Sequence, residues 1–363
     1  MRVNFLTSWN ERCGISEYSR LLVDALRQRA EVEIVPATFR AAPKPVYRAM
    51  GTALNGGDVA HVQHSYAFFG GMHPWRSGWF ALAGAVRRPL LVTVHELDLR
   101  PTGAYHLPPA VEIAYKRQFN RAVFLHPAVR RWFTHSESLR DALVNLGAPP
   151  GRVTYRPIPV AIPTLPPPDS APLRRQLHLE GKRVLVILGF LARRKGYEVA
   201  LRALRNLPSD VVLVAAGGEH AADHSGTEAW LRAEAERAGV AERLRVTGYL
   251  DAATLEQATA LADVVVAPFL EMSASASLSY ALARGKAVVA SDLGENRGLN
   301  CVRLVPPGDP EALTKALREV VEQPSLRADL ERQGLSYARQ HSYSALGEET
   351  RMLYDQLLEQ FAR

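Results

Sequence analysis

The feature that most constrains the fold is a regular alternation of short, β-branched apolar runs with longer amphipathic stretches. Runs such as RVNFLT (2–7) and PLLVTVHE (89–96) predict strands. The stretch between residues 16 and 28, with leucines on one face, predicts a helix. Strands that alternate with helices are joined by right-handed crossovers and form parallel sheets. The alternation therefore predicts a doubly wound α/β fold.

A proline-rich segment divides this alternation into two series. Seven prolines fall between residues 156 and 173, and neither a helix nor a central strand tolerates that density. A second series begins with the run KRVLVILGF at residues 182–190 and ends in helical stretches. A chain of 363 residues also exceeds the size that one hydrophobic core usually serves. We therefore predict two Rossmann-like domains in tandem.

Composition narrows the class of protein further. An apolar share of 47% with 22% charged residues is typical of a folded, soluble chain. The first residues turn polar too soon for a signal peptide, and no apolar run reaches the ~20 residues of a membrane span, so we expect a cytoplasmic protein. Cys13 and Cys301 have no metal-type spacing, which argues against a disulfide framework and a zinc site.

The net charge of +7 is unevenly distributed. Residues 1–170 hold 20 Lys and Arg against 12 Asp and Glu, whereas the remainder holds 24 against 25. Such asymmetry is compatible with a nucleic acid, an anionic membrane or an anionic substrate, but solvated Arg-rich helix faces explain it as simply. Nucleic-acid binding lacks the interleaved aromatic residues and the motif that it would need.

Ligands of open parallel sheets bind beyond the carboxyl ends of the strands, so the loops that leave the strands are the candidate sites. Gly14 follows the first strand and would let backbone amides approach a ligand, although a lone glycine is as often a turn. His95 ends the strand VTVHEL, as a satisfied core residue or as a ligand contact. Gln63 and His64 end another strand, with the same two interpretations open.

Two loops of the second series carry the strongest signals. In LGFLARRKGYE, the cations Arg193, Arg194 and Lys195 lie between a strand end and a helix start, which favours a site for a diphosphate. In PFLEMSASASLSYAL, an acidic residue is followed by small and hydroxyl-bearing residues that allow close backbone approach and can cap a helix or bind phosphate. These residues are Glu271, Ser273, Ser275 and Ala276.

Together these motifs resemble the GT-B glycosyltransferases of family four, which are retaining enzymes with nucleotide-sugar donors. The resemblance covers nearly the whole chain and includes CGISEYS, DVAHVQHSYAFFGG, VTVHEL, THSESLRDAL, GFLARRKG and VTGYLDAATLEQATALADVVVAPF. It implies two Rossmann-like domains whose parallel sheets face each other across a cleft. Residues 1–165 would bind the acceptor and residues 166–342 the donor, and a C-terminal helix over 343–363 would pack back on the first domain.

The resemblance also implies roles for single residues. Lys195, with Arg193 or Arg194, would hold the donor diphosphate. Gly14 would adjoin the donor, and His95 and Glu271 would contact the transferred sugar. The family usually carries a second glutamate eight residues after the first, to bind the ribose hydroxyls. Counted back from GKAVV, the second place holds Tyr280 in this chain, nine residues after Glu271, which implies a weaker hold on the ribose.

The implied reaction moves a sugar to a hydroxyl of a glycan, a glycolipid or a small molecule. No acidic pair suited to a metal accompanies the candidate residues, so we expect side-chain cations and helix amides, with no metal cofactor, to stabilise the leaving diphosphate. Retention implies that a departing phosphate oxygen accepts the proton of the acceptor. A nonenzymatic GT-B protein that binds a nucleotide or scaffolds a partner, an epimerase and a phosphorylase are the alternatives.

The segment YAFFGGMHPWRSGWF at residues 66–80 raises the question of membrane contact. Its aromatic residues lie beside Arg76 in the basic first half, and such a mixture can insert into an anionic membrane surface that carries a lipid-linked acceptor. The same aromatic residues could instead form core or a pocket for a soluble acceptor. The sequence leaves both interpretations open.

Overall fold

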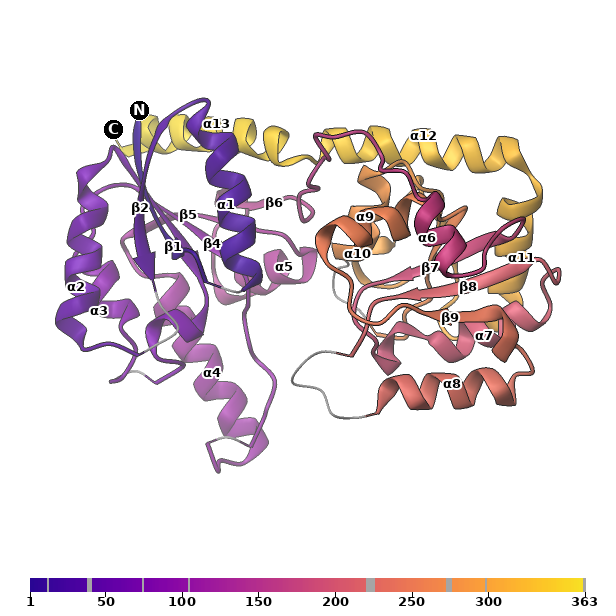
Figure 1. Ribbon diagram of the computed structural model, residues 1–363. Helices are drawn as coiled ribbons and strands as arrows, with labels where there is room; N and C mark the ends of the chain where they lie inside the picture. The colour runs from indigo at the N-terminus through magenta and orange to yellow at the C-terminus, as the bar shows by residue number, and fades with distance from the viewer. Residues whose placement is uncertain are drawn as a thin grey trace. The chain divides into compact units, whose positions relative to one another are not determined.

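The computed structural model describes residues 1–361 except 12, 38–40, 74, 104, 220–225, 272–275 and 298. The chain forms two compact units (Figure 1). Unit 1 comprises Met1–Ile158 with Tyr343–Arg363, and unit 2 comprises Pro159–Ser342. The division falls inside the proline-rich segment, seven residues before the boundary expected from the sequence.

Unit 1 is built on a parallel six-stranded sheet in the order β2-β1-β3-β4-β5-β6. The order reverses between β1 and β3. The central strands β3 and β4 are buried along their whole length, which explains the nearly continuous apolar run of β4, whereas β3 also buries His61, Gln63 and His64. The strands are β1 (Arg2–Ser8), β2 (Glu31–Ala37), β3 (Val59–His64), β4 (Leu90–Val94), β5 (Val129–Thr134) and β6 (Val153–Tyr155).

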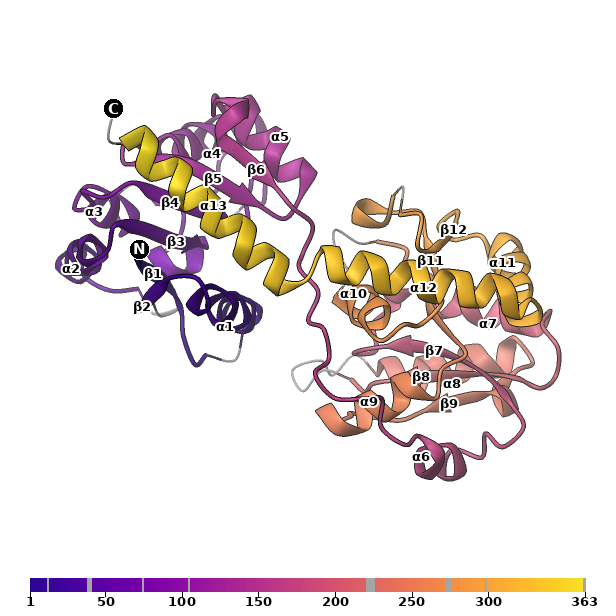
Figure 2. The ribbon, with the colours of Figure 1, turned by 90° about the horizontal axis from the view of Figure 1, so that it is seen from above.

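The helices of unit 1 cover both faces of this sheet. Helix α13 is the last in the chain and crosses one face beside α1, where a Cβ on Gly347 would lie only 2.8 Å from the Cβ of Ala25 (Figure 2). Its buried Leu353, Tyr354 and Leu357 belong to the same core cluster as residues of β1 and α1. The helices are α1 (Gly14–Arg27), α2 (Lys44–Ala53), α3 (Trp79–Ala83), α4 (Pro109–Phe124), α5 (Glu137–Leu146) and α13 (Tyr343–Phe361).

Unit 2 has a second parallel six-stranded sheet, in the order β12-β11-β10-β7-β8-β9. Its strands are β7 (Arg183–Leu188), β8 (Val211–Ala216), β9 (Leu244–Val246), β10 (Val264–Ala267), β11 (Val288–Ser291) and β12 (Arg303–Val305). Its helices are α6 (Ala171–Gln176), α7 (Tyr197–Arg205), α8 (Thr227–Arg237), α9 (Ala252–Ala260), α10 (Ala276–Ala283), α11 (Pro310–Glu322) and α12 (Pro324–Gln340). The two parallel sheets confirm the predicted doubly wound α/β class.

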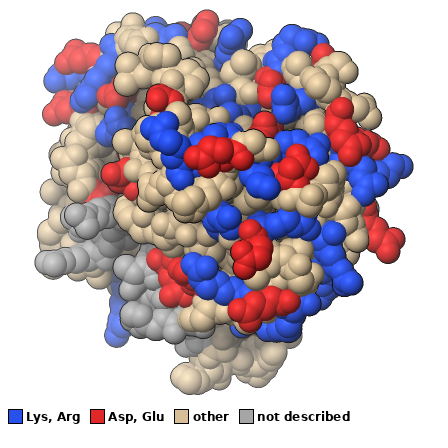
Figure 3. All heavy atoms as spheres, turned by 45° about the vertical axis from the view of Figure 1, so that its right-hand side comes forward, with Lys and Arg blue, Asp and Glu red and all other residues tan. Residues whose placement is uncertain are grey.

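The aromatic segment at residues 66–80 is mostly core. Tyr66, Phe68, Phe69 and Trp79 are buried in the main apolar cluster of unit 1, so of the two interpretations left open for these four the structure supports core and not membrane insertion. Trp75 is the exception, because 75% of its surface is exposed. Side chains of both charges are interspersed on the face in Figure 3, which presents no extended area of one sign. Among the described helices, none combines the length and the apolar character needed to cross a bilayer.

Candidate functional site

The strand order of unit 2 creates a switch point between β7 and β10. From β7 the chain moves to β8 and β9 on one side, and it then returns to β10 and moves to β11 and β12 on the other side. Loops that leave such neighbouring strands diverge, which opens a crevice at the carboxyl edge of the sheet. The two loops here are residues 189–196 and 268–275. They are the same two loops that the sequence analysis singled out.

The described parts of these loops are in direct contact. The backbone amide of Leu270 donates a hydrogen bond to the carbonyl oxygen of Arg194 at 2.8 Å. Gly196 has a φ of +69°, and a Cβ there would lie 1.9 Å from the carbonyl oxygen of Pro268. Only glycine meets both requirements, because other residues disfavour this backbone conformation and would collide with the neighbouring loop. The structure therefore brings Lys195 and the Leu270–Glu271 segment together.

Lys195 is the most unusual cation of this edge, with only 7% of its surface exposed. Its ammonium group donates to the carbonyl oxygen of Leu188 at the end of β7, and no described carboxylate pairs with it. Burial, and secondarily the charge of Arg194, lower the pKa of Lys195 to about 8. A buried ammonium with unused donors is a good partner for an anion, since pairing would relieve the desolvation cost.

The neighbouring cations are exposed. Arg193 lies over the ring of Trp230, with the guanidinium carbon 4.6 Å from the ring centre, which fixes its direction through a cation–π contact. Arg194 and Glu271 are both exposed, close to the hydrogen bond that joins the two loops. Ser273 and Ser275 lie outside the described residues. Ala276 begins α10, and its side chain is likewise not described.

Tyr280 lies in the second turn of α10 and contacts a neighbouring helix. The guanidinium of Arg284 lies 3.2 Å from its ring centre, and its hydroxyl is close enough to the carboxylate of Glu256 in α9 for the two groups to interact. Burial and this contact with a carboxylate raise the pKa of Tyr280. Arg284 also donates to Glu256, with a distance of 2.7 Å from Nε to Oε2. The Tyr280 hydroxyl is thus already engaged, and its contact with a ribose stays a prediction.

Two exposed aromatic residues at the same sheet edge were missed by the sequence analysis. Phe190 follows β7 and Tyr249 follows β9, and their rings are stacked with centres 6.4 Å apart. They are 45% and 75% exposed. Gly218 permits this arrangement, because a Cβ there would lie 2.6 Å from the amide nitrogen of Tyr249. Separated by about sixty residues, the pair cannot be recognised from local sequence.

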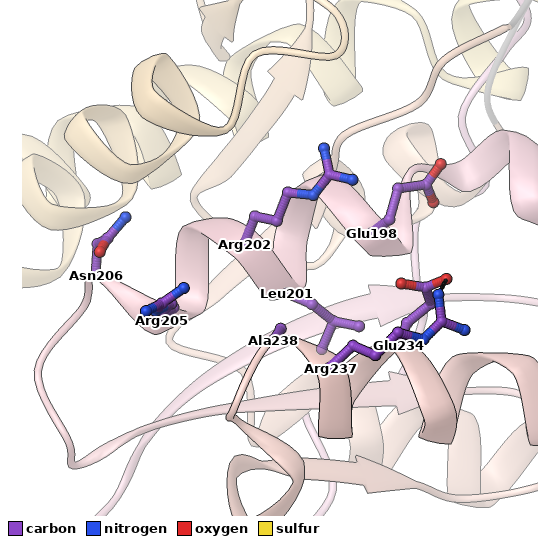
Figure 4. A pocket seen from close by; sticks show the side chains of 8 residues that line it. All are labelled: Glu198, Leu201, Arg202, Arg205, Asn206, Glu234, Arg237 and Ala238. Carbon is purple, nitrogen blue, oxygen red and sulfur yellow. Dashed lines mark hydrogen bonds and ion pairs between the residues drawn. The ribbon is translucent and has the colours of Figure 1, made fainter.

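A cavity of about 560 Å³ in unit 2 lies elsewhere, between α7 and α8 (Figure 4). Its lining mixes both charges, and Arg237 Nη1 pairs with Glu234 Oε1 at 2.7 Å. Apart from Glu198 in the first turn of α7, its lining residues come from the bodies and carboxyl ends of these helices, and none belongs to the two loops at the switch point. It is lined by Glu198, Leu201, Arg202, Arg205, Asn206, Glu234, Arg237 and Ala238.

In unit 1, His95 directly follows β4 and is partly buried. Its Nε2 lies 2.7 Å from Oε1 of Gln63, at the end of the neighbouring strand β3. The amide nitrogen of Gln63 faces Nε2 of His61 at 3.1 Å and Oγ1 of Thr93 at 3.3 Å. Nδ1 of His61 in turn lies 2.6 Å from the hydroxyl of Tyr354 in α13. A chain of hydrogen bonds therefore runs from α13 to His95.

This chain determines which nitrogen of His95 holds the proton. Burial, followed by the nearby histidines, lowers the pKa of His95 to about 3, so the ring is neutral at pH 7. An amide oxygen only accepts hydrogen bonds, so Nε2 of His95 must be the donor to Gln63. Nδ1 then keeps its lone pair and can accept a hydrogen bond from a hydroxyl group.

The other histidines of this region are structural. Nε2 of His135 lies 2.8 Å from the hydroxyl of Tyr18, and burial lowers the pKa of His135 to about 4. His64 is enclosed by aromatic rings, among them Phe124 at 4.8 Å and Trp79 at 5.1 Å between ring centres. Burial lowers the pKa of His64 to about 3. Of the two interpretations left open for His64, the structure supports the core one.

A buried ion cluster fixes the loop that follows His95. Nζ of Lys116 lies 2.8 Å from Oδ2 of Asp98 and 3.1 Å from Oε1 of Glu112. Glu112 also accepts a hydrogen bond from the amide of Thr102 at 2.8 Å, which is the first cause of its lowered pKa of about 2. The loop is therefore attached to α4 at several points.

Gly14 is the first residue of α1 and is exposed, with no atom within 4 Å of a Cβ built on it. The sulfur of Cys13 caps this helix by accepting a hydrogen bond from the amide of Ser16. A cavity of about 440 Å³ adjoins the helix start and is lined by residues of the β1–α1 loop and the first turns of α1. This is the carboxyl edge at the switch point of unit 1, between β1 and β3.

Two doubly wound units in tandem, one of them with cations at its switch point, are typical of the GT-B fold of glycosyltransferases. Residues 182–323, within unit 2, match the family model "Glycosyl transferases group 1". The chain is also similar to a phosphatidyl-myo-inositol mannosyltransferase of Mycobacterium leprae, with 32% identity over 195 residues. That match covers 52% of this chain and 50% of the relative, so it spans about half the length of the curated protein.

Solved structures match over nearly the whole chain. HepE of Anabaena in complex with UDP aligns with a TM-score of 0.73 at 17% identity and covers 98% of this chain and 100% of its own. Sucrose-phosphate synthase of Thermosynechococcus elongatus aligns with a TM-score of 0.71 at 19% identity, over 99% of both chains. At these identities the similarity shows the fold.

Proposed function

We propose that the protein is a retaining glycosyltransferase that moves a sugar from a nucleoside diphosphate sugar to a hydroxyl acceptor. The observation that carries this proposal is Lys195, a buried ammonium without a carboxylate partner at the switch point of unit 2. A diphosphate supplies the negative charge that this position lacks. The family match over residues 182–323 supports the proposal, as do the UDP and UDP-glucose named for the HepE structures.

The geometry of the edge suggests how the donor binds. Lys195 and Arg194 hold the diphosphate, and Arg193, braced by Trp230, adds charge from the side. The exposed rings of Phe190 and Tyr249 offer a flat apolar surface at the same edge, suited to a nucleobase. Glu271 contacts the hydroxyls of the transferred sugar.

The chemical step needs stabilisation of the negative charge that develops on the leaving diphosphate. Lys195 and the arginines supply the positive charge that stabilises the leaving diphosphate, which is the reason to propose transfer without a metal. A departing phosphate oxygen accepts the proton of the acceptor hydroxyl on the same face, so no separate base is required. In unit 1, the unprotonated Nδ1 of His95 accepts a hydrogen bond from the sugar, and Gly14 adjoins the donor.

The acceptor is proposed to be lipid-linked, with the protein bound at the periphery of an anionic membrane. The mannosyltransferase relative is named for phosphatidyl-myo-inositol, a phospholipid, and this name supports the choice. Leu107, Val111 and Ile113 are exposed apolar residues around the start of α4. Trp75 and the adjacent Arg76 are exposed in the segment whose Met72 carbonyl oxygen accepts a hydrogen bond from Tyr115 of α4. Apolar side chains with adjacent cations suit the surface of an anionic bilayer.

The membrane proposal is tested by cosedimentation with vesicles that contain anionic lipid, at low and high salt. Trp75→Ser should reduce binding, whereas Tyr249→Ser, which removes an equally exposed aromatic residue from unit 2, should not. Absence of salt-sensitive binding would leave a soluble glycan or small molecule as the better acceptor.

The enzymatic proposal is tested by thermal unfolding in the presence of UDP, GDP, ADP and TDP, followed by assays of donor hydrolysis with the matching sugar nucleotides. A ligand at 100 times its Kd stabilises a protein by about 2.7 kcal/mol, which is easily measured. Binding without hydrolysis or transfer to any acceptor would favour a noncatalytic nucleotide-binding protein, for which the engaged hydroxyl of Tyr280 is the supporting observation. No stabilisation by any nucleotide would contradict both.

A further inference from the structure

Arg131 in β5 is a buried cation without a hydrogen-bond partner. Only 8% of its surface is exposed, and its Nε is fully buried with no acceptor. Within the described residues, the Arg131 side chain forms no ion pair and no hydrogen bond. A buried guanidinium that is left unpaired is costly, and native proteins rarely retain one without a reason.

The nearest charged neighbours increase this cost. Arg152 lies close enough to Arg131 that its charge adds to burial in lowering the pKa of Arg131. Arg130, the next residue in the strand, is also cationic, and neither Arg130 nor Arg152 pairs with a carboxylate in the part of the chain that the structure describes. In contrast, the partly buried Arg183 and Arg284 of unit 2 are paired with Asp210 and Glu256.

Two of the three arginines, Arg130 and Arg152, line a small cavity below the end of α13. Arg131 is paired in register with Leu91 and lies two residues before Phe133, and both of these pack with Leu357 of α13. Alternation along the strand therefore directs Arg131 to the α13 face. A cavity of about 260 Å³ in this region is lined by Arg130, Arg152, Leu357, Gln360 and Phe361.

This cavity is separate from the site proposed above. Arg130 and Arg131 begin β5, and Arg152 precedes β6, so all three lie at the amino edge of the sheet. His95 and Gly14 lie at the opposite, carboxyl edge. The negative end of the α13 dipole accounts in part for cations near Phe361, over which Arg130 lies at 6.0 Å. It does not provide Nε of Arg131 with an acceptor.

We propose that Arg130, Arg131 and Arg152 form a binding site for a phosphate group, carried by a small molecule or by a lipid headgroup. Guanidinium groups bind phosphate oxygens in pairs, and the planar donors of three arginines suit the several oxygens of a phosphate ester. The side-chain amide of Gln360 adds a further donor at the rim. The proposal does not depend on the glycosyltransferase assignment.

The test measures phosphate binding to the full-length protein. Because phosphate can also occupy the donor site, all variants carry Lys195→Ala. Thermal unfolding and calorimetric titration use inorganic phosphate and a phosphate monoester, at an ionic strength held constant with chloride. We expect saturable stabilisation that Arg131→Met and Arg152→Met each weaken at least tenfold. Arg48→Met, at an exposed position of α2, is the matched control and should leave the affinity unchanged.

A second readout separates a ligand site from a structural role. Without phosphate, Arg131→Met should unfold at the same or a higher temperature than its parent, since an unpaired buried charge has been replaced by an apolar side chain of similar length. A lower temperature combined with unchanged phosphate affinity would overturn the proposal. If Arg131→Met does not fold, the affinity of Arg152→Met, altered at an exposed position, decides.

The source of the phosphate group is distinguished with vesicles. Binding of phosphatidylglycerol vesicles that is lost in Arg152→Met, without an effect of soluble phosphate, would identify a lipid headgroup. Saturable binding of soluble phosphate, without an effect of Arg152→Met on vesicles, would identify a free metabolite. Absence of both effects, or an equal loss in Arg48→Met, would overturn the proposal.

Discussion

Units 1 and 2 share a topology but differ in the chemistry at the carboxyl edges of their sheets. In both, six strands run parallel, the order in which the chain adds them to the sheet reverses once, and candidate residues follow strands at or next to that switch point. In unit 1 the candidate side chain is a neutral histidine, His95, which is oriented by Gln63 and linked through it to the buried His61. Unit 2 presents cations, with Lys195 buried and two arginines exposed. The same fold thus places an uncharged hydrogen-bonding group at the sheet edge of one unit and a group of cations at the sheet edge of the other.

The largest expected difference between the units is their response to acid. The pKa values of His61, His64 and His95 are about 3 and that of His135 about 4 in the folded protein, chiefly because of burial. An unfolded histidine titrates near 6.5. The stabilisation of unit 1 is therefore complete above pH 6.5 and declines as the pH falls toward 4, by up to about 1.4 kcal/mol per pH unit for each histidine.

Hydrogen exchange of the full-length protein between pH 7 and 4.5, corrected for the intrinsic rate, measures this difference. Peptides of β3 and β4 should lose protection before peptides of β7 and β10, since no buried histidine occurs in the described part of unit 2. His64→Phe retains the aromatic packing and removes one titrating group. It should reduce by one the number of protons that unit 1 takes up when it unfolds in acid. Equal loss of protection in both units would contradict the expected difference in acid sensitivity between them.

The next largest effect is expected for the buried cation of unit 2. A charge-assisted hydrogen bond to phosphate contributes about 1.5 to 3 kcal/mol, so Lys195→Ala should lower kcat/KM by one to two orders of magnitude. Lys315→Ala, at an exposed position of α11, is the control. In the parent enzyme kcat/KM should also decline as the pH rises through about 8, where free Lys195 loses its proton. Unchanged kinetics in a folded Lys195→Ala variant would contradict the assignment.

A smaller effect is expected from the neutral group of unit 1. Gln63→Glu places a carboxylate beside Nε2 of His95 and should raise the pKa of His95, because the charged ring gains a partner. Gln63→Leu removes the acceptor that fixes the tautomer and should lower kcat by about tenfold. Nitrogen chemical shifts of the histidine rings report both changes. If Nε2 of His95 is unprotonated in the wild-type protein, the tautomer argument fails.

The smallest effect concerns Tyr280. Tyr280→Glu should tighten nucleotide binding by a few-fold, because a carboxylate accepts hydrogen bonds from ribose hydroxyls more strongly than a phenol does. Tyr280→Phe removes only the hydroxyl that now contacts Glu256, so it should change the affinity by less than about threefold. Calorimetric titration with the preferred nucleotide compares the two. A large loss in Tyr280→Phe would instead show that the hydroxyl itself contacts the ligand.

The sequence predicted the α/β class well because apolar strands and amphipathic helices leave local patterns. It also indicated the two loops of unit 2, since both lie between a strand and a helix. It could not show that Leu270 contacts Arg194, because that contact depends on the order of β7 and β10 in the sheet. The link between His61 and Tyr354 was missed for the same reason, as 293 residues separate them.

The sequence misled where the environment decides the role of a side chain. Phe68 and Trp79 are equally compatible with a membrane surface and a core, and only the packing around His64 shows that they are core. Arg131, in contrast, carries no indication of a special role in the sequence. It occupies an unremarkable place in a strand, and neither its burial nor its lack of a partner is visible in local sequence.

The position of α13 in unit 1 has a consequence for biosynthesis. On the ribosome, the first 158 residues emerge before the helix that covers their sheet, and the whole of unit 2 is translated in between. Until residues 343–361 follow, Phe5 and Phe133 lack their apolar cover and His61 lacks the hydroxyl of Tyr354. Unit 2, which is continuous in sequence, can complete its fold first. The nascent N-terminal sheet must therefore wait until α13 has been translated, and during that interval its exposed apolar surface can bind a chaperone.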